Sequence, residues 1–240
     1  MTNTLSSAAE TAVPGPAAAA LLQAAGLILP DLERGAAVTA HSLRAAMQTV
    51  FGASDAQGAW DWKAAYEACE AAQVLFLRKY GSAMFRKAPS GHGRLAMIEK
   101  LAARLPTHTR RSEAGQALQQ FSTPAGLAFV AGVAAAIQPG ELVLEPSAGT
   151  GLLAIFAELA GARLALNELA DTRADLLARL FPDGPVSRHD AAHIHDHLDA
   201  AVAPRVVLMN PPFGAVAHVD HAMKDAALRH VGSALARLRP

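Results

Sequence analysis

Short apolar runs alternate with helical stretches in the second half of the chain, and this pattern restricts the fold more than any other feature. The runs are Leu142–Leu144, Arg163–Leu166 and Val206–Met209, with a weaker one around Val186. Residues 151–160 and 172–181, which lie between runs, have the apolar spacing of helices. Continuous apolar strands that alternate with helices are typical of a parallel sheet covered on both faces. The sequence therefore predicts an α/β fold with about four parallel strands.

Three regions follow from the change of pattern along the chain. Residues 1–15 are small, polar and interrupted by proline, which is typical of a disordered leader. Residues 16–113 carry apolar side chains at helical spacing, so we predict an all-helical region there. Residues 114–240 contain the alternating strands and helices and form the predicted α/β core.

Local signals mark helix ends within the all-helical region. Asp61 can accept a hydrogen bond from a free backbone N–H group at the start of a helix. Gly52 and Gly81 can adopt the left-handed conformation that ends a helix. We therefore expect one helix to end at Gly52 and the next to run from Asp61 to Gly81.

The composition excludes several classes of protein. The chain has a formal net charge of zero and a single cysteine, Cys69, so no net field attracts nucleic acid and no internal disulfide can form. No apolar run reaches the roughly 18 residues of a membrane span, and the first residues lack the features of a signal peptide. We expect a cytoplasmic protein without a membrane partner.

Two further features have alternative interpretations. Residues 78–111 carry nine Lys and Arg against one acid, so the stretch could contact a phosphate backbone or simply form a solvated helix face. Four alternating histidines within residues 189–197 could chelate a metal, or they could lie in a solvated loop. Because no cysteine accompanies these histidines, we expect no metal site.

The segment LVLEPSAGTGLLAIFAELAG (142–161) predicts a strand, a tight turn and a helix. Gly149 and Gly151 let the backbone approach a ligand closely, and the free N–H groups of the next helix point into the same space. The turn lacks the Gly-Lys-Ser/Thr of a phosphate loop and the complete pattern of a dinucleotide fold. Glu145, at the end of the strand, would repel a phosphate and attract an ammonium group. A zwitterionic amino-acid moiety therefore fits this turn better than a pyrophosphate.

Acidic residues also end the next two strands. Glu168 lies about 20 residues after the glycine turn, where a carboxylate can accept hydrogen bonds from both hydroxyls of a ribose. Asp190 can accept a hydrogen bond from an adenine amino group, with Ala191 against the ring. Each acid alone could be a helix cap or an exposed loop residue. The carboxyl ends of parallel strands meet at one edge of a sheet, so we expect Glu145, Glu168 and Asp190 to converge on one crevice.

The fourth apolar run ends in NPPF (210–213) rather than in an ordinary turn. EPSAGTG, Glu168, Asp190 and NPPF, in that order, resemble the class I S-adenosylmethionine-dependent methyltransferases with a Rossmann-like sheet. More narrowly, they resemble the enzymes that methylate exocyclic nitrogens, above all N6 of adenine in DNA. The order of the motifs is similar to that of the gamma type, and the resemblance covers residues 115–240.

The resemblance implies an S-adenosylmethionine site and a set of residues that form it. Phe-x-Thr-Pro, within residues 119–137, would close over the methionine end of the cofactor. The residues expected to bind the cofactor are Phe121, Thr123, Pro124, Glu145, Pro146, Ala148, Gly149, Gly151, Glu168, Leu169, Asp190, Ala191 and Asn210. The residues expected to act in catalysis are Asn210, Pro211, Pro212 and Phe213.

The expected role of NPPF follows from the chemistry of an exocyclic amino group, whose lone pair is delocalised into the ring. The side-chain carbonyl of Asn210 and the backbone carbonyl of Pro211 can each accept one amino hydrogen, which favours a tetrahedral nitrogen. The two prolines restrict the backbone and hold both acceptors in place. Phe213 offers a ring against which an extruded base can stack. The implied activity is methylation of adenine N6 in DNA.

Several alternatives remain open. RNA base methylases share NPPF, and protein glutamine methylases have the similar NPPY. A non-catalytic nucleic-acid-binding module on a methyltransferase scaffold is a further alternative. The chain also resembles plasmid- and phage-type methylases, in which a helicase-like region can follow. The sheet of the family continues beyond a fourth strand, so we expect a core truncated before strand five, with weak or no activity in the isolated chain.

Overall fold

The protein is described by a computed structural model that covers residues 15–106, 122–211 and 224–239. All but one residue of the predicted leader 1–15, and the predicted boundary at residue 113, lie outside these ranges. None of the helices in the described ranges is long and apolar enough to cross a membrane.

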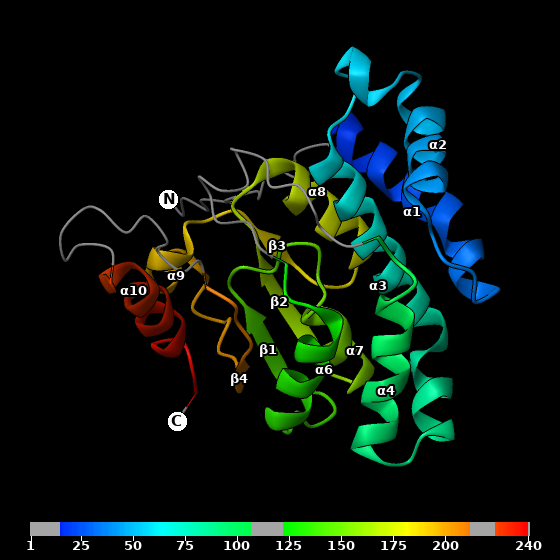
Figure 1. Cartoon of the computed structure of the whole chain (residues 1–240). Helices are drawn as coiled ribbons and strands as arrows, with labels where there is room; N and C mark the ends of the chain where they lie inside the picture. The colour runs from blue at the N-terminus through cyan, green and yellow to red at the C-terminus, as the bar shows by residue number, and fades with distance from the viewer. Residues whose placement is uncertain (1–14, 107–121, 212–223, 240) are drawn as a thin grey trace, which may run out of the picture.

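Four parallel strands form the central sheet (Figure 1). In the order in which they lie side by side, they are β3 (Val186–Ser187), β2 (Arg163–Asn167), β1 (Leu142–Glu145) and β4 (Val206–Val207). On β1, Val143 pairs with Leu164 of β2 on one side and with Val206 of β4 on the other. The strand order is that of the first four strands of a Rossmann-like sheet, and it reverses between β1 and β4, where open α/β sheets bind ligands. The predicted α/β fold is confirmed.

The strand expected at Val206–Met209 is shorter in the structure. Only Val206 and Val207 belong to β4, although the N–H group of Leu208 still donates a hydrogen bond of 3.0 Å to the carbonyl of Leu144. Among the described strands, β4 and β3 are the two outer ones. An outer strand has a partner on one side only, and a short ladder therefore suffices for it.

Helices occupy the chain before the sheet, as the sequence predicts. They are α1 (Pro16–Glu33), α2 (Ala40–Phe51), the short 3₁₀ helix η1 (Asp55–Gln57), α3 (Trp62–Lys87) and α4 (Gly91–Ala102). Gly52 follows α2 with a φ of 74°, and Asp61 caps α3 by accepting a hydrogen bond of 2.7 Å from the N–H group of Ala64. Both of these predicted helix ends are confirmed.

The predicted end at Gly81 is wrong, because α3 continues to Lys87. Gly81 lies where α3 crosses α7 (Ala154–Leu159), and a Cβ atom there would stand 2.7 Å from Cδ1 of Leu159. The glycine therefore allows a close approach of two helices within a continuous helix. A sequence pattern does not distinguish this use of glycine from a helix end.

Helices cover both faces of the sheet (Figure 1). Figure 1 shows α3, α6 (Ala125–Ala134), α7 and α8 (Asp171–Leu180) on one side of the sheet. The 3₁₀ helix η2 (Ala191–His193), the short α9 (Ile194–His197) and α10 (Lys224–Leu235) lie on the other side. Leu77 of α3 and Ile155 of α7 are fully buried in one continuous apolar cluster. The helical region and the sheet thus share a hydrophobic core.

Candidate functional site

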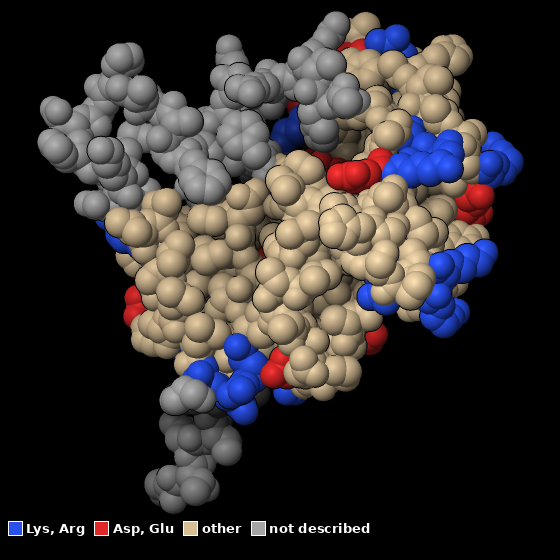
Figure 2. Space-filling view, turned by 60° about the horizontal axis from the view of Figure 1, so that its bottom comes forward, with Lys and Arg blue, Asp and Glu red and all other residues tan. Residues whose placement is uncertain are grey.

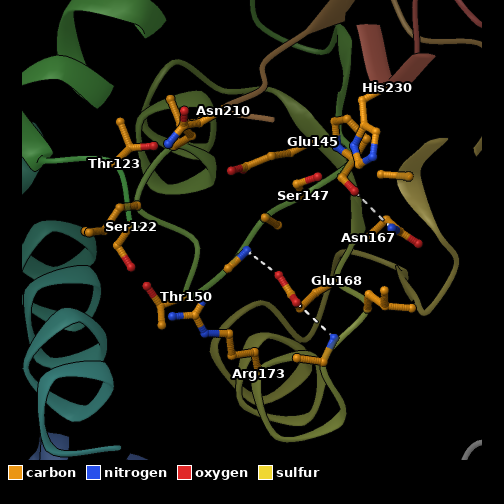
Figure 3. Close-up of a pocket in the computed structure, with 18 of the residues that line it drawn as sticks. Ser122, Thr123, Glu145, Ser147, Thr150, Asn167, Glu168, Arg173, Asn210 and His230 are labelled. Carbon is orange, nitrogen blue, oxygen red and sulfur yellow. Dashed lines mark hydrogen bonds between the residues drawn. The ribbon is translucent and has the colours of Figure 1, made fainter. Parts of the chain in front are cut away.

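A cavity opens at the carboxyl ends of the four strands (Figure 3). Residues that end or follow every strand line it, which is the convergence expected from the parallel sheet. The predicted site residues that line the cavity are Thr123, Glu145, Pro146, Ala148, Gly149, Glu168, Leu169, Asp190, Ala191 and Asn210. One hollow therefore brings together predicted residues that are up to 87 positions apart in the chain (210 − 123).

The remaining predicted residues do not line the cavity or are not described. Phe121, Pro212 and Phe213 lie outside the described residues. Pro124 is exposed and precedes α6, and Pro211 is half-buried; neither lines the cavity.

Gly151 does not line the cavity, although its neighbours Thr150 and Leu152 do and we expected its backbone to approach a ligand. Its φ is 86°, and a Cβ atom on it would stand 2.3 Å from the Phe181 ring. Gly151 is thus required by packing against α8 and the residue after it, whereas Gly149 is the glycine that faces the cavity.

The glycine turn is held by Glu168, which follows β2. Oε2 of Glu168 accepts a hydrogen bond of 2.8 Å from the N–H group of Gly149, and Oε1 accepts one of 2.9 Å from Ala170. The two amides fix the orientation of the carboxylate at the cavity. Each carboxylate oxygen can accept a second hydrogen bond, so acceptor capacity remains for a ligand hydroxyl.

Asn167 joins the ends of three strands. Its side-chain N–H₂ group donates to the carbonyls of Pro146, after β1, and His189, after β3, at 2.9 and 2.8 Å. Its side-chain oxygen accepts hydrogen bonds from the backbone N–H group of His189 and the hydroxyl of Ser187. All four hydrogen bonds of the Asn167 side chain are made within the protein, so Asn167 has a structural role and holds the edge of the cavity in place.

Glu145, at the end of β1, is a buried acid with an unused oxygen. The residue is 2% exposed, and its Oε2 has no hydrogen-bond partner among the described residues. Figure 3 shows the carboxyl pointing into the cavity. Burial, and then the nearby charge of Glu168, raise the pKa of Glu145 well above its usual value. A ligand cation beside Glu145 would act in the opposite direction and favour the carboxylate form.

Asp190 lies at the far side of the cavity from Asn210 in the strand order. Its Oδ1 caps η2 by accepting a hydrogen bond of 2.9 Å from the N–H group of Ala192. Ala191 beside it is buried and lines the cavity. The cap role does not conflict with ligand binding, because a carboxylate has further lone pairs.

His230 of α10 is a cavity residue that sequence reasoning missed. Its Nδ1 is buried without a hydrogen-bond partner in the part of the chain that the structure describes. Burial lowers the pKa of His230, while the charge of Asp190 acts in the opposite direction. His230 is far from any motif in sequence, and only the packing of α10 on η2 brings it to the cavity.

The histidine-rich segment contributes one residue to the cavity, His189, whose ring stacks on that of His197 at 4.9 Å. Within the described ranges, no three His, Cys, Asp or Glu side chains gather in a way that could hold a metal ion. The single cysteine, Cys69, is buried in α3, and burial raises the pKa of its thiol to about 12.

Comparison with known proteins finds solved structures that resemble part of this chain. No protein-family model and no curated protein matches the chain. A candidate RNA methyltransferase from Pyrococcus horikoshii is 23% identical, with a TM-score of 0.45 over 60% of this chain and 70% of that one. TrmN from Thermus thermophilus is 23% identical, with a TM-score of 0.41 over 53% of this chain and 39% of that one. The chain thus spans well under half the length of TrmN.

Two acids of α3, Glu67 and Glu70, also belong to the surroundings of the cavity and were not predicted. Arg173, which lines the cavity, donates a hydrogen bond of 2.6 Å to Glu67, and Thr150 donates one of 2.6 Å to Glu70. A signal for them existed in the sequence. Two glutamates three positions apart interrupt an otherwise apolar helical stripe, and buried acids are rare unless they are paired.

Part of the basic stretch 78–111 is engaged within the protein. Arg78 forms a two-pronged ion pair with Glu158, at 2.6 and 2.9 Å, and Lys79 pairs with Glu33 at 2.7 Å. Arg94 donates to the carbonyl of Ala88. Figure 2 shows Lys and Arg gathered at the edges of the viewed face, with uncharged residues across its middle. Nucleic-acid contact by this stretch stays a prediction.

Proposed function

We propose that the protein is an S-adenosylmethionine-dependent methyltransferase that acts on an exocyclic amino group of a nucleic-acid base. The buried carboxyl of Glu145 supports this proposal most strongly. A buried acid with an unpartnered oxygen at a cavity is costly unless a ligand supplies the missing partner. The α-ammonium group of S-adenosylmethionine would supply both a hydrogen-bond donor and a positive charge.

The order of the acids across the sheet supports the same ligand. Glu145 ends β1, and Glu168 and Asp190 follow β2 and β3; these three strands are consecutive neighbours in the sheet. Neighbouring strands lie about 4.8 Å apart, so the three acids span about 10 Å. An ammonium group at β1, a ribose at β2 and a base at β3 reproduce the order amino acid, ribose, adenine. Three acids would repel a pyrophosphate placed there.

Asn210 would act on the group that receives the methyl. When bound, the cofactor supplies an activated methyl group on a sulfonium centre. Because β4 lies next to β1, Asn210 follows the strand nearest to Glu145 and farthest from Asp190. Its side-chain carbonyl would accept a hydrogen from the amino group and orient the nitrogen lone pair. The half-buried position of Asn210 at the cavity keeps the amide accessible from outside.

Adenine N6 in DNA is the acceptor that we propose, on the resemblance of NPPF to the DNA adenine enzymes. Proline at 211 restricts the backbone beside Asn210, and Phe213, which lies outside the described residues, would stack on the extruded base. Methyl transfer to adenine in RNA instead of DNA would change the proposed substrate, because the same chemistry of the amino group applies to both nucleic acids.

Calorimetric titration with S-adenosylmethionine and S-adenosylhomocysteine tests the cofactor site. We expect saturable binding of both and its loss in Glu145→Gln. Binding should be unchanged in Glu141→Gln, an acid that directly precedes the same strand and does not line the cavity. A folded wild-type chain that binds neither compound would overturn the proposal.

Transfer of a labelled methyl group to adenine-containing DNA and to RNA of the same sequence tests the acceptor. At saturating cofactor, Asn210→Ala should transfer at least about a hundredfold less than the wild type, the loss seen when a preorganised polar group is removed. Binding by the wild type with no transfer to either polymer would favour the non-catalytic alternative.

A further inference from the structure

A buried polar cluster lies between α3 and the glycine turn. Its members are Glu67 and Glu70 of α3, Arg173 of α8, Thr150 of the turn and Ser122, which precedes α6. Both glutamates are at most 6% exposed, and Thr150 is 2% exposed. Polar side chains buried this deeply require partners, and the cluster supplies them across the boundary between helices and sheet.

One oxygen of Glu70 joins two segments of the cavity wall. Oε2 accepts a hydrogen bond of 2.7 Å from the hydroxyl of Ser122 and one of 2.6 Å from the hydroxyl of Thr150. Ser122 and Thr150 both line the cavity. They are 52 and 80 positions from Glu70 in the chain, so the contact is a product of tertiary packing.

One buried cation, Arg173, accompanies the two glutamates of the cluster. Arg173 donates to Glu67 at 2.6 Å, with both side chains at most 7% exposed. Although burial lowers the pKa of Arg173, the charges of Glu67 and Glu70, in that order, act to raise it, and the net shift is upward. The charge of Glu168 acts in the same direction. The cluster therefore connects α3 electrostatically to the acid that holds the glycine turn.

We propose that Glu70 is a positioning residue that sets the spacing between the Ser122–Thr123 segment and the glycine turn at the amino-acid end of the cofactor site. This inference rests on the proposed function. Figure 3 shows Ser122 and Thr150 on the α3 side of the cavity, with Thr123 and Asn210 above them and His230 on the opposite side. The helical region is accordingly a component of the site.

A positioning role and a general contribution to stability can be told apart, because they affect the binding of different ligands. S-adenosylhomocysteine carries the amino-acid moiety, whereas 5′-methylthioadenosine has the same nucleoside without it. Because Glu70 contacts the wall away from His230 and Asp190, its loss should weaken binding of the first compound and leave binding of the second unchanged. A merely structural role would weaken both equally.

The experiment compares three variants of α3 by calorimetry with the two compounds. Glu70→Met removes the acceptor at similar length, Glu70→Gln retains a carbonyl oxygen, and Gln73→Met is the control. Gln73 is 4% exposed on the same helix, does not line the cavity, and its Nε2 has no partner among the described residues. We expect about tenfold weaker binding of S-adenosylhomocysteine in Glu70→Met, within the coupling range of one hydrogen-bond network. Glu70→Gln should recover most of this loss, and Gln73→Met should show none.

Equal loss for both compounds, or no loss for either, would overturn the inference. If Glu70→Met does not fold, the partner-side variants Ser122→Ala and Thr150→Val should show the same selectivity for S-adenosylhomocysteine. If the wild type binds neither compound, the proposed function fails and hydrogen exchange of the ligand-free protein decides this inference. The amides of Ser122, Thr123 and Ala125 and of residues 147–151 should then exchange faster in Glu70→Met than in Gln73→Met, and equal rates would contradict the inference.

Discussion

Replacing Glu145 with glutamine should stabilise the ligand-free protein at neutral pH while abolishing cofactor binding. The carboxyl is fully buried, and burial followed by the charge of Glu168 raises its pKa well above the usual value. The folded chain therefore keeps this proton at a pH where the unfolded chain has released it. The wild type loses free energy of unfolding over that pH range, and Glu145→Gln, which has no proton to release, does not.

The magnitude follows from a single proton. Below about pH 4.3, the pKa of an unperturbed glutamate, both states are protonated and Glu145 makes no difference. Above it, the free energy of unfolding of the wild type falls by about 1.4 kcal/mol per pH unit relative to the variant, until the pH passes the raised pKa of the folded state. For a chain of this length, this difference corresponds to about 4 °C in melting temperature per pH unit.

Thermal and urea denaturation of the wild type and Glu145→Gln, carried out between about pH 5 and about pH 8, measure this difference in the free energy of unfolding. Glu141→Gln, directly before β1, serves as the control for loss of one acid whose side chain is only partly buried. Parallel stability profiles of the wild type and Glu145→Gln, or a variant less stable at every pH, would refute the reasoning.

Ligand binding should reverse the protonation. An ammonium group beside Glu145 lowers the pKa of the carboxyl, so binding of S-adenosylhomocysteine at pH 7 should release up to about one proton per site. Titrations in buffers with different ionisation enthalpies measure this number. Binding without proton release would separate the ammonium group from Glu145 and contradict the assigned orientation.

Four further substitutions, each measured by urea denaturation, test the packing that positions the site. Gly151→Ala should cost about 3 kcal/mol or more, because the new methyl group meets the Phe181 ring at a positive φ. Gly81→Ala should change stability by less than about 1 kcal/mol, because the new methyl group meets the end of the flexible Leu159 side chain and alanine is favoured over glycine within a helix. Equal costs would contradict this contrast. Glu67→Met should cost about 3–5 kcal/mol by leaving Arg173 buried without this partner, and a near-neutral result would show that Arg173 is satisfied elsewhere. Asp61→Ala should cost about 1 kcal/mol through loss of the α3 cap, and no change would assign the start of α3 to packing alone.

The sequence by itself determined the sheet and the convergence of the predicted site. Apolar runs that alternate with helices require a parallel sheet, and parallel strands end at a common edge. Glu145, Glu168, Asp190 and Asn210 each follow a strand, so their shared cavity follows from the strand pattern without any long-range information. The caps at Gly52 and Asp61 were also readable, because capping depends on neighbouring residues only.

Tertiary structure alone decided which other residues complete the cavity. Glu70 and His230 come from helices that carry no motif, and they reach the site because α3 packs on α7 and α8 and α10 packs on η2. The use of Gly81 for a helix crossing and of Gly151 for packing against Phe181 likewise depends on residues far along the chain. Local patterns specify which element forms and which residue ends it. They do not specify which side chains of distant helices face each other, since that is set by how the apolar faces pack together.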